Sequence, residues 1–466
     1  MQPRLSNGTD ARRREQYAPS VAQHAQFLAA LLSGGDSRVA IDPRTSTNKY
    51  ACPPMPAPDL VCFSSCTASP VSWRAFEHAG ECYDTVAGAL SHGDRVERLQ
   101  VYRRRIEHTL LRYFGAVGLA DVILCPSGTD ALLTAAAMLA AERPGEMMTA
   151  ILPIASETGT GVPLAAAGRW FDGPAAGTPL AGCAIEAVQV PLRTADGTPR
   201  SEDELNSAFA SAARNAHGRP VVYVTHGSKT GLIAPTQVPA GIDAIVDACQ
   251  ARIDPASVAA YLQRGWPVAV TGSKFFGGPA FSGALLFPRA RLASPPCSRL
   301  TWRAGLHHEA DNLGMILRWI AALDTIEAFD LRAGDSHGVL RGLGSAVERA
   351  LGDIPALVPI AGLQTRAPGW ADAPSIFTFA VRDSAAPQRL LPAAELRLLY
   401  EQLARDGILL GQPVHLGSFG GLRIAISARD LLDGGAAGRL DIVLDVLANI
   451  TASSASWRRA TFVGRC

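Results

Sequence analysis

The stretch Thr271-Gly-Ser-Lys-Phe-Phe-Gly-Gly-Pro279 places one lysine, Lys274, among small and apolar residues, directly after a short apolar run at 268–271. Such a run is typical of a buried strand, so Lys274 lies at a predicted strand end. A lysine in these surroundings loses solvation, which lowers its pKa and makes its amine available as a nucleophile. The alternative interpretation is a lysine that extends along apolar surface to solvent.

Short apolar runs like this one recur upstream and downstream and alternate with helical patterns. Strands are predicted at 121–125, 149–154, 184–190, 221–225, 244–247, 268–271 and 281–287, with helices at 95–114, 129–141, 202–215 and 255–263. Strands that alternate with helices indicate an α/β fold, here a mostly parallel seven-stranded sheet covered on both faces.

The pattern differs at the two ends of the chain. The first ~35 residues are polar and mixed, which predicts a mobile or partly helical arm. From about residue 296 there are long predicted helices (313–329, 338–350, 393–406), then strands at 375–381 and 421–427 and a helix near 440–448. We therefore expect an N-terminal arm and substrate-lining segment (1–75), a large domain (76–295) and a smaller C-terminal α+β domain (296–466).

Composition excludes several classes of protein. The 466 residues hold 43 Lys and Arg against 42 Asp and Glu, which gives no electrostatic reason to expect nucleic acid or an acidic membrane surface. The longest apolar run, 135–141, is too short to span a bilayer, and the first residues lack the apolar segment of a secretory signal. Nine scattered cysteines without a C-x-x-C pair indicate reduced thiols rather than a disulfide framework or a metal site. A cytoplasmic enzyme is expected.

Two other predicted strand ends carry groups that suit one ligand together with Lys274. Gly128 and Thr129 open a helix after the strand at 121–125, where free backbone N–H groups can bind an anion such as phosphate, although Ser, Thr and Asp are also ordinary helix caps. Asp247 ends another apolar strand, and a buried carboxylate needs a cationic partner. Pyridoxal 5'-phosphate (PLP) needs this set: a phosphate cradle, an acid that keeps the pyridine nitrogen protonated and a lysine that forms a Schiff base.

Three motifs then resemble those of the fold-type I PLP-dependent enzymes, particularly the class V aminotransferase and cysteine desulfurase branch, and also selenocysteine synthase. PSGTDA (126–131) resembles the SGATE-type phosphate loop, DACQ (247–250) resembles DAAQ, and TGSKFFGGPAFSGAL (271–285) resembles SGHKFYGPKGIGAL. The resemblance covers roughly residues 63–426 but is specific only at these short motifs.

The resemblance implies a role for each matching residue. Lys274 and Asp247 would be catalytic, and Gln250 would bind the ring hydroxyl. Ser228, in THGSKTGLIAPT, stands where an Asn often lies beside that hydroxyl, and Thr158 stands where many relatives stack a ring on the cofactor. The implied cofactor-binding set is Gly128, Thr129, Thr158, Ser228, Asp247, Gln250, Thr271, Ser273 and Lys274.

Substrate-binding residues are implied in three places. Arg423, in Gly-Leu-Arg-Ile-Ala-Ile, resembles the arginine that binds a substrate α-carboxylate, for which a two-bond guanidinium is suited. Thr67, in TASPV, resembles a turn that lines the substrate pocket. His226, at a strand end beside Ser228, is either a pocket residue or a satisfied core histidine.

The motifs leave the reaction open. The desulfurase cysteine would fall on the segment before Arg423, yet residues 411–420 contain no Cys, so we expect no persulfide chemistry by that route. We expect an aminotransferase-like transferase that acts on an amino acid or amino-bearing metabolite. A PLP-dependent lyase or β/γ-replacement enzyme and decarboxylation stay open, as does an inactive sensor or scaffold. The family's active site lies at a subunit interface, so the resemblance also implies a homodimer.

Overall fold

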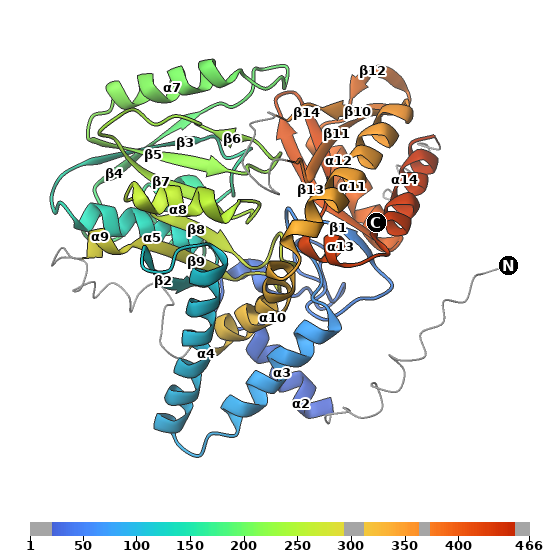
Figure 1. The fold of residues 1–466 in the computed structure, drawn as a ribbon. Helices are drawn as coiled ribbons and strands as arrows, with labels where there is room; N and C mark the ends of the chain where they lie inside the picture. Colours follow the sequence, from blue (N-terminus) through green and yellow to red (C-terminus); the bar gives the residue numbers. More distant parts are fainter. Residues whose placement is uncertain (1–20, 293–311, 363–372, 453–466) are drawn as a thin grey trace.

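The computed structural model describes residues 21–292, 312–362 and 373–452, and its larger sheet has eight strands (Figure 1). Their order is β2 (Ala120–Cys125), β9 (Gly283–Pro288), β8 (Val268–Thr271), β7 (Asp243–Ala248), β5 (Arg219–His226), β3 (Met148–Pro153) and β4 (Ile185–Val190), with β6 (Ile233–Ala234) beside β5. β9 is antiparallel to both of its neighbours, and the pairs from β8 to β4 are parallel. The predicted α/β fold with a mostly parallel seven-stranded sheet is confirmed along this path.

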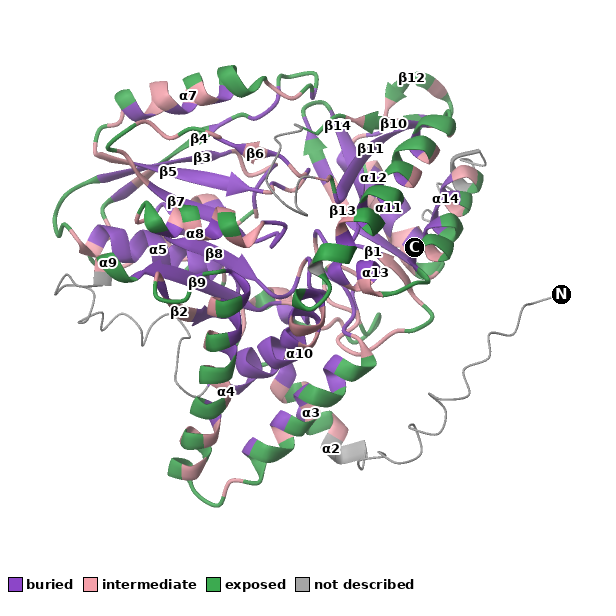
Figure 2. Ribbon diagram, in the orientation of Figure 1, coloured by how far each residue is buried: buried purple, intermediate pink, exposed green. Residues whose placement is uncertain are grey.

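Helices cover both faces of this sheet because its strands are apolar on both sides. Tyr223 of β5 packs in the cluster formed with α5 (Gly128–Ala141), while its neighbours Val222 and Val224 pack in the cluster on the opposite face. That opposite face is covered by α7 (Glu202–Arg214) and α8 (Pro255–Gln263). In Figure 2 the strands and α5 are largely buried, whereas α7 shows an exposed outer side.

The second sheet has six strands. Its order is β1 (Val61–Phe63), β13 (Ile408–Leu416), β14 (Phe419–Ala425), β11 (Ile376–Asp383) and β10 (Leu357–Ile360), with β12 (Ala386–Leu390) beside β11. Around it lie α11 (Ala333–Asp353), α12 (Ala393–Arg405), α13 (Ala428–Leu432) and α14 (Ala436–Ala452) (Figure 1). β1 pairs in parallel with β13, so a segment near the N-terminus completes a sheet built from the C-terminal third.

A helical layer joins the two sheets. It contains α2 (Val21–Leu31), α3 (Trp73–Ala87), α4 (His92–Tyr113) and α10 (Leu313–Asp330), and α10 contacts the other three. α10 is buried almost all round (Figure 2). Smaller helical elements complete the fold, namely a 3-10 turn at Ser37–Val39, α6 (Val162–Ala166) and α9 (Arg289–Leu292). None of the helices that the structure describes is both long and apolar enough to cross a membrane.

One expectation about local structure needs correction. Residues 411–420 were predicted to lie outside any strand, but they are most of a β-hairpin, because β13 and β14 pair and turn only around Gly417 and Ser418. The N-terminal arm was predicted to be mobile or partly helical, and its described part is helical, since α2 buries Phe27 and Leu31 in the core. Residues 1–20 lie outside the described residues, and the three domain limits stay a prediction.

Candidate active site

The predicted site segments meet at one edge of the larger sheet. Gly128 follows β2, Ser228 follows β5, Asp247 lies near the end of β7, and Lys274 follows β8. Since the β5, β7 and β8 strands are parallel, their carboxyl ends share this edge. Open α/β sheets bind their ligands there.

The start of α5 approaches this edge closely. Ser127 caps the helix, because its Oγ accepts a hydrogen bond from the Asp130 backbone N–H (3.2 Å). A Cβ at Gly128 would lie 2.5 Å from Sγ of Cys249 and 2.9 Å from Cγ2 of Thr271, so only glycine fits between the neighbouring strand ends. The helix N-terminus, with its free N–H groups, is thereby held against the segments that carry Asp247 and Lys274.

Lys274 and Asp247 are held differently. Asp247 is buried, and its Oδ1 accepts from the Cys249 backbone N–H (3.1 Å). Among the described residues, the Lys274 amine has no hydrogen-bond partner, and its side chain is partly exposed. Desolvation lowers the pKa of Lys274, while the nearby charge of Asp247 opposes that shift. The result is an amine that is available for reaction beside a fixed carboxylate.

The whole sequence contains only three lysines, at positions 49, 229 and 274, against a total of 43 Lys and Arg. Two of them belong to this site. The Lys229 Nζ donates to the Ala155 carbonyl (2.8 Å), and desolvation first, then the charge of Arg423, lowers the pKa of Lys229 to about 8. Apart from Lys49, the other Lys and Arg residues of the chain are all arginines, whereas these two positions carry amines whose pKa is lowered.

Gln250 is fixed by a buried arginine that sequence reasoning missed. Gln250 donates through Nε2 to the Cys66 carbonyl (3.2 Å) and accepts from Arg252 Nη1 through Oε1 (2.9 Å). Arg252 also donates to Ser65 Oγ (2.7 Å), to Ser375 Oγ (2.9 Å) and to the Ile426 carbonyl (3.0 Å). Burial lowers the pKa of Arg252 to about 10. The second sheet and the β1 segment thus set the orientation of Gln250.

Ser228 is taken up by a different network. Its Oγ donates to Glu157 Oε2 (2.7 Å), which also accepts from Thr230 Oγ1 (2.7 Å). Arg193 Nε donates to the other oxygen of Glu157 (2.8 Å), and both members of this ion pair are buried. The structure therefore directs the Ser228 hydroxyl to Glu157 rather than leaving it free for a ligand.

Three further predicted cofactor-binding side chains are buried around the same edge. Thr271 Oγ1 donates to the Cys249 carbonyl (2.7 Å), and Thr158 Oγ1 lies 3.5 Å from the Ile154 carbonyl. Ser273 is 2% exposed and lies in the turn before Lys274. These hydroxyls lie near the carboxyl ends of the strands. The Thr271 hydroxyl donates its proton to the Cys249 carbonyl, so toward a ligand it can act only as an acceptor.

Arg423 and Thr67 are brought together as predicted for a substrate pocket. Arg423 Nη2 donates to Thr67 Oγ1 (3.0 Å) and to the Gln412 carbonyl (2.7 Å), and Nε donates to that carbonyl as well (3.1 Å). Nη1 donates to the Lys229 carbonyl (3.0 Å). Within the described residues a single Nη1 hydrogen is left for a ligand. A carboxylate can therefore bind in the two-bond mode only by displacing one of these acceptors.

His226 lies apart from this cluster. It is buried, its Nδ1 lies 3.2 Å from the Tyr261 hydroxyl, and burial lowers its pKa to about 4, so the ring is neutral at pH 7. It lines a cavity of about 410 Å³ between the sheets, together with Arg252 and Thr378. Lys274 does not line this cavity, so the structure does not bring His226 to the amine.

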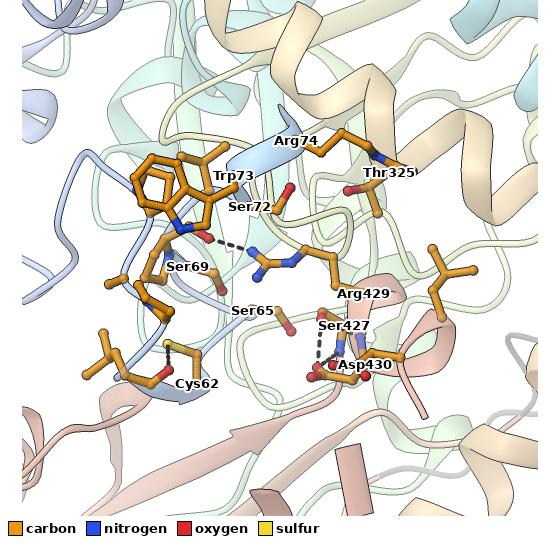
Figure 3. A pocket seen from close by; sticks show the side chains of 18 of the residues that line it. Cys62, Ser65, Ser69, Ser72, Trp73, Arg74, Thr325, Ser427, Arg429 and Asp430 are labelled. Atoms are coloured by element: carbon orange, nitrogen blue, oxygen red, sulfur yellow. Dashed lines mark hydrogen bonds between the residues drawn. The ribbon is translucent and has the colours of Figure 1, made fainter. Parts of the chain in front are cut away.

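A second cavity has a volume of about 450 Å³ and is drawn in Figure 3. Its walls come from residues 56–74, from α10 and from the start of α13, and Arg429 lies at its centre between Ser69 and Asp430 (Figure 3). A Cβ at Gly277 would lie 2.9 Å from Cδ of Arg429, so this arginine packs directly against the turn after Lys274. Lys274 does not line this cavity either. No group of three or more His, Cys, Asp or Glu side chains in the described ranges is arranged to hold a metal.

A scan against protein-family models finds no match, and a search of curated protein sequences finds none either. Solved structures, in contrast, match over most of the chain. The cystine C-S lyase C-DES, in complex with its product cysteine persulfide, has a TM-score of 0.56 at 15% identity and covers 84% of this chain and 98% of its own. A C-DES variant with glycine covalently linked to its PLP cofactor matches equally well, with a TM-score of 0.56 at 14% identity, 84% of this chain and 97% of its own.

Two proteins of other kinds match similarly. The cysteine desulfurase CsdA from Escherichia coli has a TM-score of 0.53 at 17% identity, over 83% of this chain and 95% of its own. The glutamate decarboxylase domain of a diaminobutyrate-pyruvate transaminase and L-2,4-diaminobutyrate decarboxylase from Vibrio parahaemolyticus has a TM-score of 0.58 at 15% identity, over 95% of this chain and 100% of its own. The chain therefore has the fold of the fold-type I PLP-dependent enzymes. At these identities the likeness shows the fold alone.

Proposed function

We propose that this protein binds PLP covalently through Lys274 and acts as an aminotransferase-like transferase on an amino acid or amino-bearing metabolite. The observation that carries the proposal is the partly exposed Lys274 amine, which has no hydrogen-bond partner among the described residues and lies at the strand edge that also presents Asp247 and the N-terminus of α5. When bound, PLP withdraws electrons from the Cα of an amino substrate and so stabilises negative charge there.

The residues of the chain fit that cofactor. The α5 N-terminus and Thr129 offer backbone and hydroxyl donors for the phosphate. Glycine at position 128 allows this helix end to lie close to the strand ends, because a Cβ there would clash with Cys249 and Thr271. Asp247, fixed by the Cys249 N–H, is the group that would keep the pyridine nitrogen protonated. Desolvation lowers the pKa of the Lys274 amine, which favours its neutral, nucleophilic form.

The charges around Lys274 favour an anionic substrate. Arg423 and Lys229 are neighbours, because Arg423 Nη1 donates a hydrogen bond to the Lys229 carbonyl. After desolvation, the charge of Arg423 also lowers the pKa of both Lys229 and Lys274, so the three cations lie close enough to interact. Two cations beside the reactive amine suit an amino acid carboxylate. The family's active site lies between subunits, so we also propose a homodimer, which sedimentation velocity would test.

A lyase is the second candidate. Lys229 is the observation that favours it, because an amine with a pKa of about 8 carries a proton near neutral pH and can donate it to a group that leaves from Cβ, which β-elimination requires and simple transamination does not. The two reactions give different products. An amino acid panel with a keto acid acceptor distinguishes amino-group transfer from release of ammonia or of a side-chain fragment.

The cofactor test uses the small number of lysines. Purified protein is incubated with PLP, reduced with borohydride and digested, and mass spectrometry locates the pyridoxyl group on Lys49, Lys229 or Lys274. We expect it on Lys274 in the wild type and in the matched control Lys229→Ala, and no adduct in Lys274→Ala. An adduct on another lysine of Lys274→Ala would contradict the assignment. Covalent PLP with no spectral response to any amino acid would favour the sensor or scaffold.

A further inference from the structure

Arg38, on the segment that follows α2, lies against the start of α5. Its Nη2 donates to Ser127 Oγ (2.8 Å) and its Nη1 donates to Thr129 Oγ1 (3.3 Å). Ser127 is the cap of α5 and Thr129 lies in its first turn. A guanidinium from a remote part of the chain thus stands at the helix end where the proposed phosphate would bind.

The guanidinium is held on several sides. Nε donates to Asp36 Oδ1 (2.7 Å), and Nη2 forms an ion pair with the second oxygen of Asp36. The Phe281 ring centre lies 4.4 Å from the guanidinium carbon, and that of Phe171 lies 5.4 Å away. These contacts use the Nε hydrogen, both Nη2 hydrogens and one Nη1 hydrogen, and the Tyr50 side chain also hydrogen-bonds to the guanidinium. Nη1 is the nitrogen that contacts Thr129.

A second arginine fixes the chain that carries Arg38. Arg318 of α10 is fully buried, and it donates to the carbonyls of Leu31 (2.7 Å), Ser33 (2.7 Å) and Phe281 (2.6 Å). Downstream, Ser37 donates through N and Oγ to Asp172 (2.9 and 2.7 Å). The segment between α2 and Arg38 is therefore tied to α10 at one end and to the connection between α6 and β4 at the other, so Arg38 has a defined position.

The charges around the start of α5 require a cation if a phosphate is to bind there. Asp36 and Asp130 both lie within reach of the α5 start, since Asp130 Oδ2 accepts from Ser127 Oγ (2.6 Å) and Asp36 pairs with Arg38. Two carboxylates oppose the binding of a doubly charged phosphate, and the helix end supplies only about half an elementary charge. A cation is needed to reverse the sign of the local potential.

We propose that Arg38 is a ligand of the cofactor phosphate, acting together with Thr129 and the N-terminus of α5. This inference rests on the proposed PLP function. The N-terminal segment is then part of the cofactor site, and the phosphate binds in place of, or beside, the contact between Arg38 and Thr129. A structural staple that only joins the segment to α5 is the competing explanation.

The test compares PLP with pyridoxal, which has the same aldehyde and ring but no phosphate. Dissociation constants for the apoprotein are measured by absorbance for the wild type, for Arg38→Met and for the control Arg44→Met, which removes an arginine of the same segment that is 88% exposed. We expect Arg38→Met to weaken PLP by at least about tenfold while pyridoxal affinity changes less than about twofold. Arg44→Met should leave both unchanged.

Equal loss of PLP and pyridoxal affinity, or no loss of either, would overturn the inference in favour of the staple. If thermal unfolding shows that Arg38→Met does not fold, Arg38→Lys keeps a charge and an apolar stem beside Phe281, and the ratio of the two affinities must still shift toward pyridoxal. An unchanged ratio in that variant would also overturn the inference. If the wild type forms an adduct with neither aldehyde, the proposed function fails instead.

Discussion

Lys274 and Arg423, both residues of the proposed site, are supported by different sheets, and their surroundings differ. At the edge of the larger sheet, the Lys274 amine has no hydrogen-bond partner in the described part of the chain. At the second sheet, Arg423 donates to Thr67 and to two backbone carbonyls, and Arg252 has every N–H donor occupied. The first sheet thus presents a reactive group, whereas the second presents cations whose positions are already fixed.

This difference predicts how each region responds to substitution. Changes at the larger sheet remove chemistry and leave the shape of the site intact. Changes at the second sheet leave the chemistry and alter recognition, because carbonyls that now accept from arginine lose their donor.

The largest effect is expected for Asp247→Ala. PLP should stay bound through its phosphate, but an unprotonated pyridine nitrogen accepts electrons poorly, so turnover should fall by about 10³-fold or more, which is about 4 kcal/mol of transition-state stabilisation. Single-turnover absorbance with the best substrate of the panel measures this. Turnover near that of the wild type would exclude a role for Asp247 at the ring nitrogen.

Arg423→Lys should have an intermediate effect, and only on the affinity for amino acid substrates. An ammonium cannot reproduce the planar two-bond contact that a carboxylate makes once it displaces one of the present acceptors of Arg423, so the dissociation constant of amino acid substrates should rise about 10- to 100-fold. The absorbance of the resting protein should not change. The matched control is Arg382→Lys, an exposed arginine on the neighbouring β11. Equal substrate affinity in all three proteins would mean that another group binds the carboxylate.

A smaller effect, visible through pH, is expected at Lys229. Because its pKa is lowered to about 8, Lys229 is charged below pH 8 and neutral above it. The KM for an anionic substrate should therefore rise as pH passes upward through about 8, and Lys229→Met should show the higher KM at every pH with no such rise. A KM profile that is identical in the variant and the wild type would place Lys229 outside the substrate pocket.

We expect that the protein forms no persulfide when cysteine is added. Residues 411–420 contain no thiol, and burial raises the pKa of Cys125 and Cys249 far above that of a free thiol and that of Cys62 to about 12. Thiols that stay protonated are poor nucleophiles. Cysteine plus PLP-loaded protein should leave the intact mass unchanged. A gain of one sulfur atom on any cysteine, Cys66 included, would contradict this.

Local periodicity was sufficient to predict most of the larger sheet. All seven strands predicted there are present within three residues of their expected limits, because most of them are short apolar runs, and the central ones are buried on both faces, whereas the edge strand β4 has three exposed residues. β1 and β13 were not predicted, although β14, the hairpin partner of β13, was predicted at 421–427. β1 has three residues and β13 contains Gly411 and Pro413, so their pairing depends on partners distant in sequence rather than on local preference.

For the site, the motifs identified residues at or just after the carboxyl ends of the strands, such as Gly128, Asp247 and Lys274. They did not identify Arg38 or Arg318, which act from segments far from those motifs, nor Arg252, which lies two residues after DACQ. Nor did they show that Glu157 engages Ser228. An arginine in a sequence is usually a solvated surface residue, and only burial and partners distinguish these. His226 matched a strand-end pattern, but its direction depends on the packing of Tyr261.

The pairing of β1 with β13 has a consequence for biosynthesis. Val61 pairs with Ile408, so this edge of the second sheet cannot close until nearly the whole chain has left the ribosome. At about 5–20 residues per second, the nascent β1 segment waits roughly 20–70 s for its partner. During that time its backbone N–H and C=O groups and its neighbouring cysteines are exposed. A nascent-chain chaperone, or slow translation toward the C-terminus, would therefore affect the yield of this protein more than its final stability.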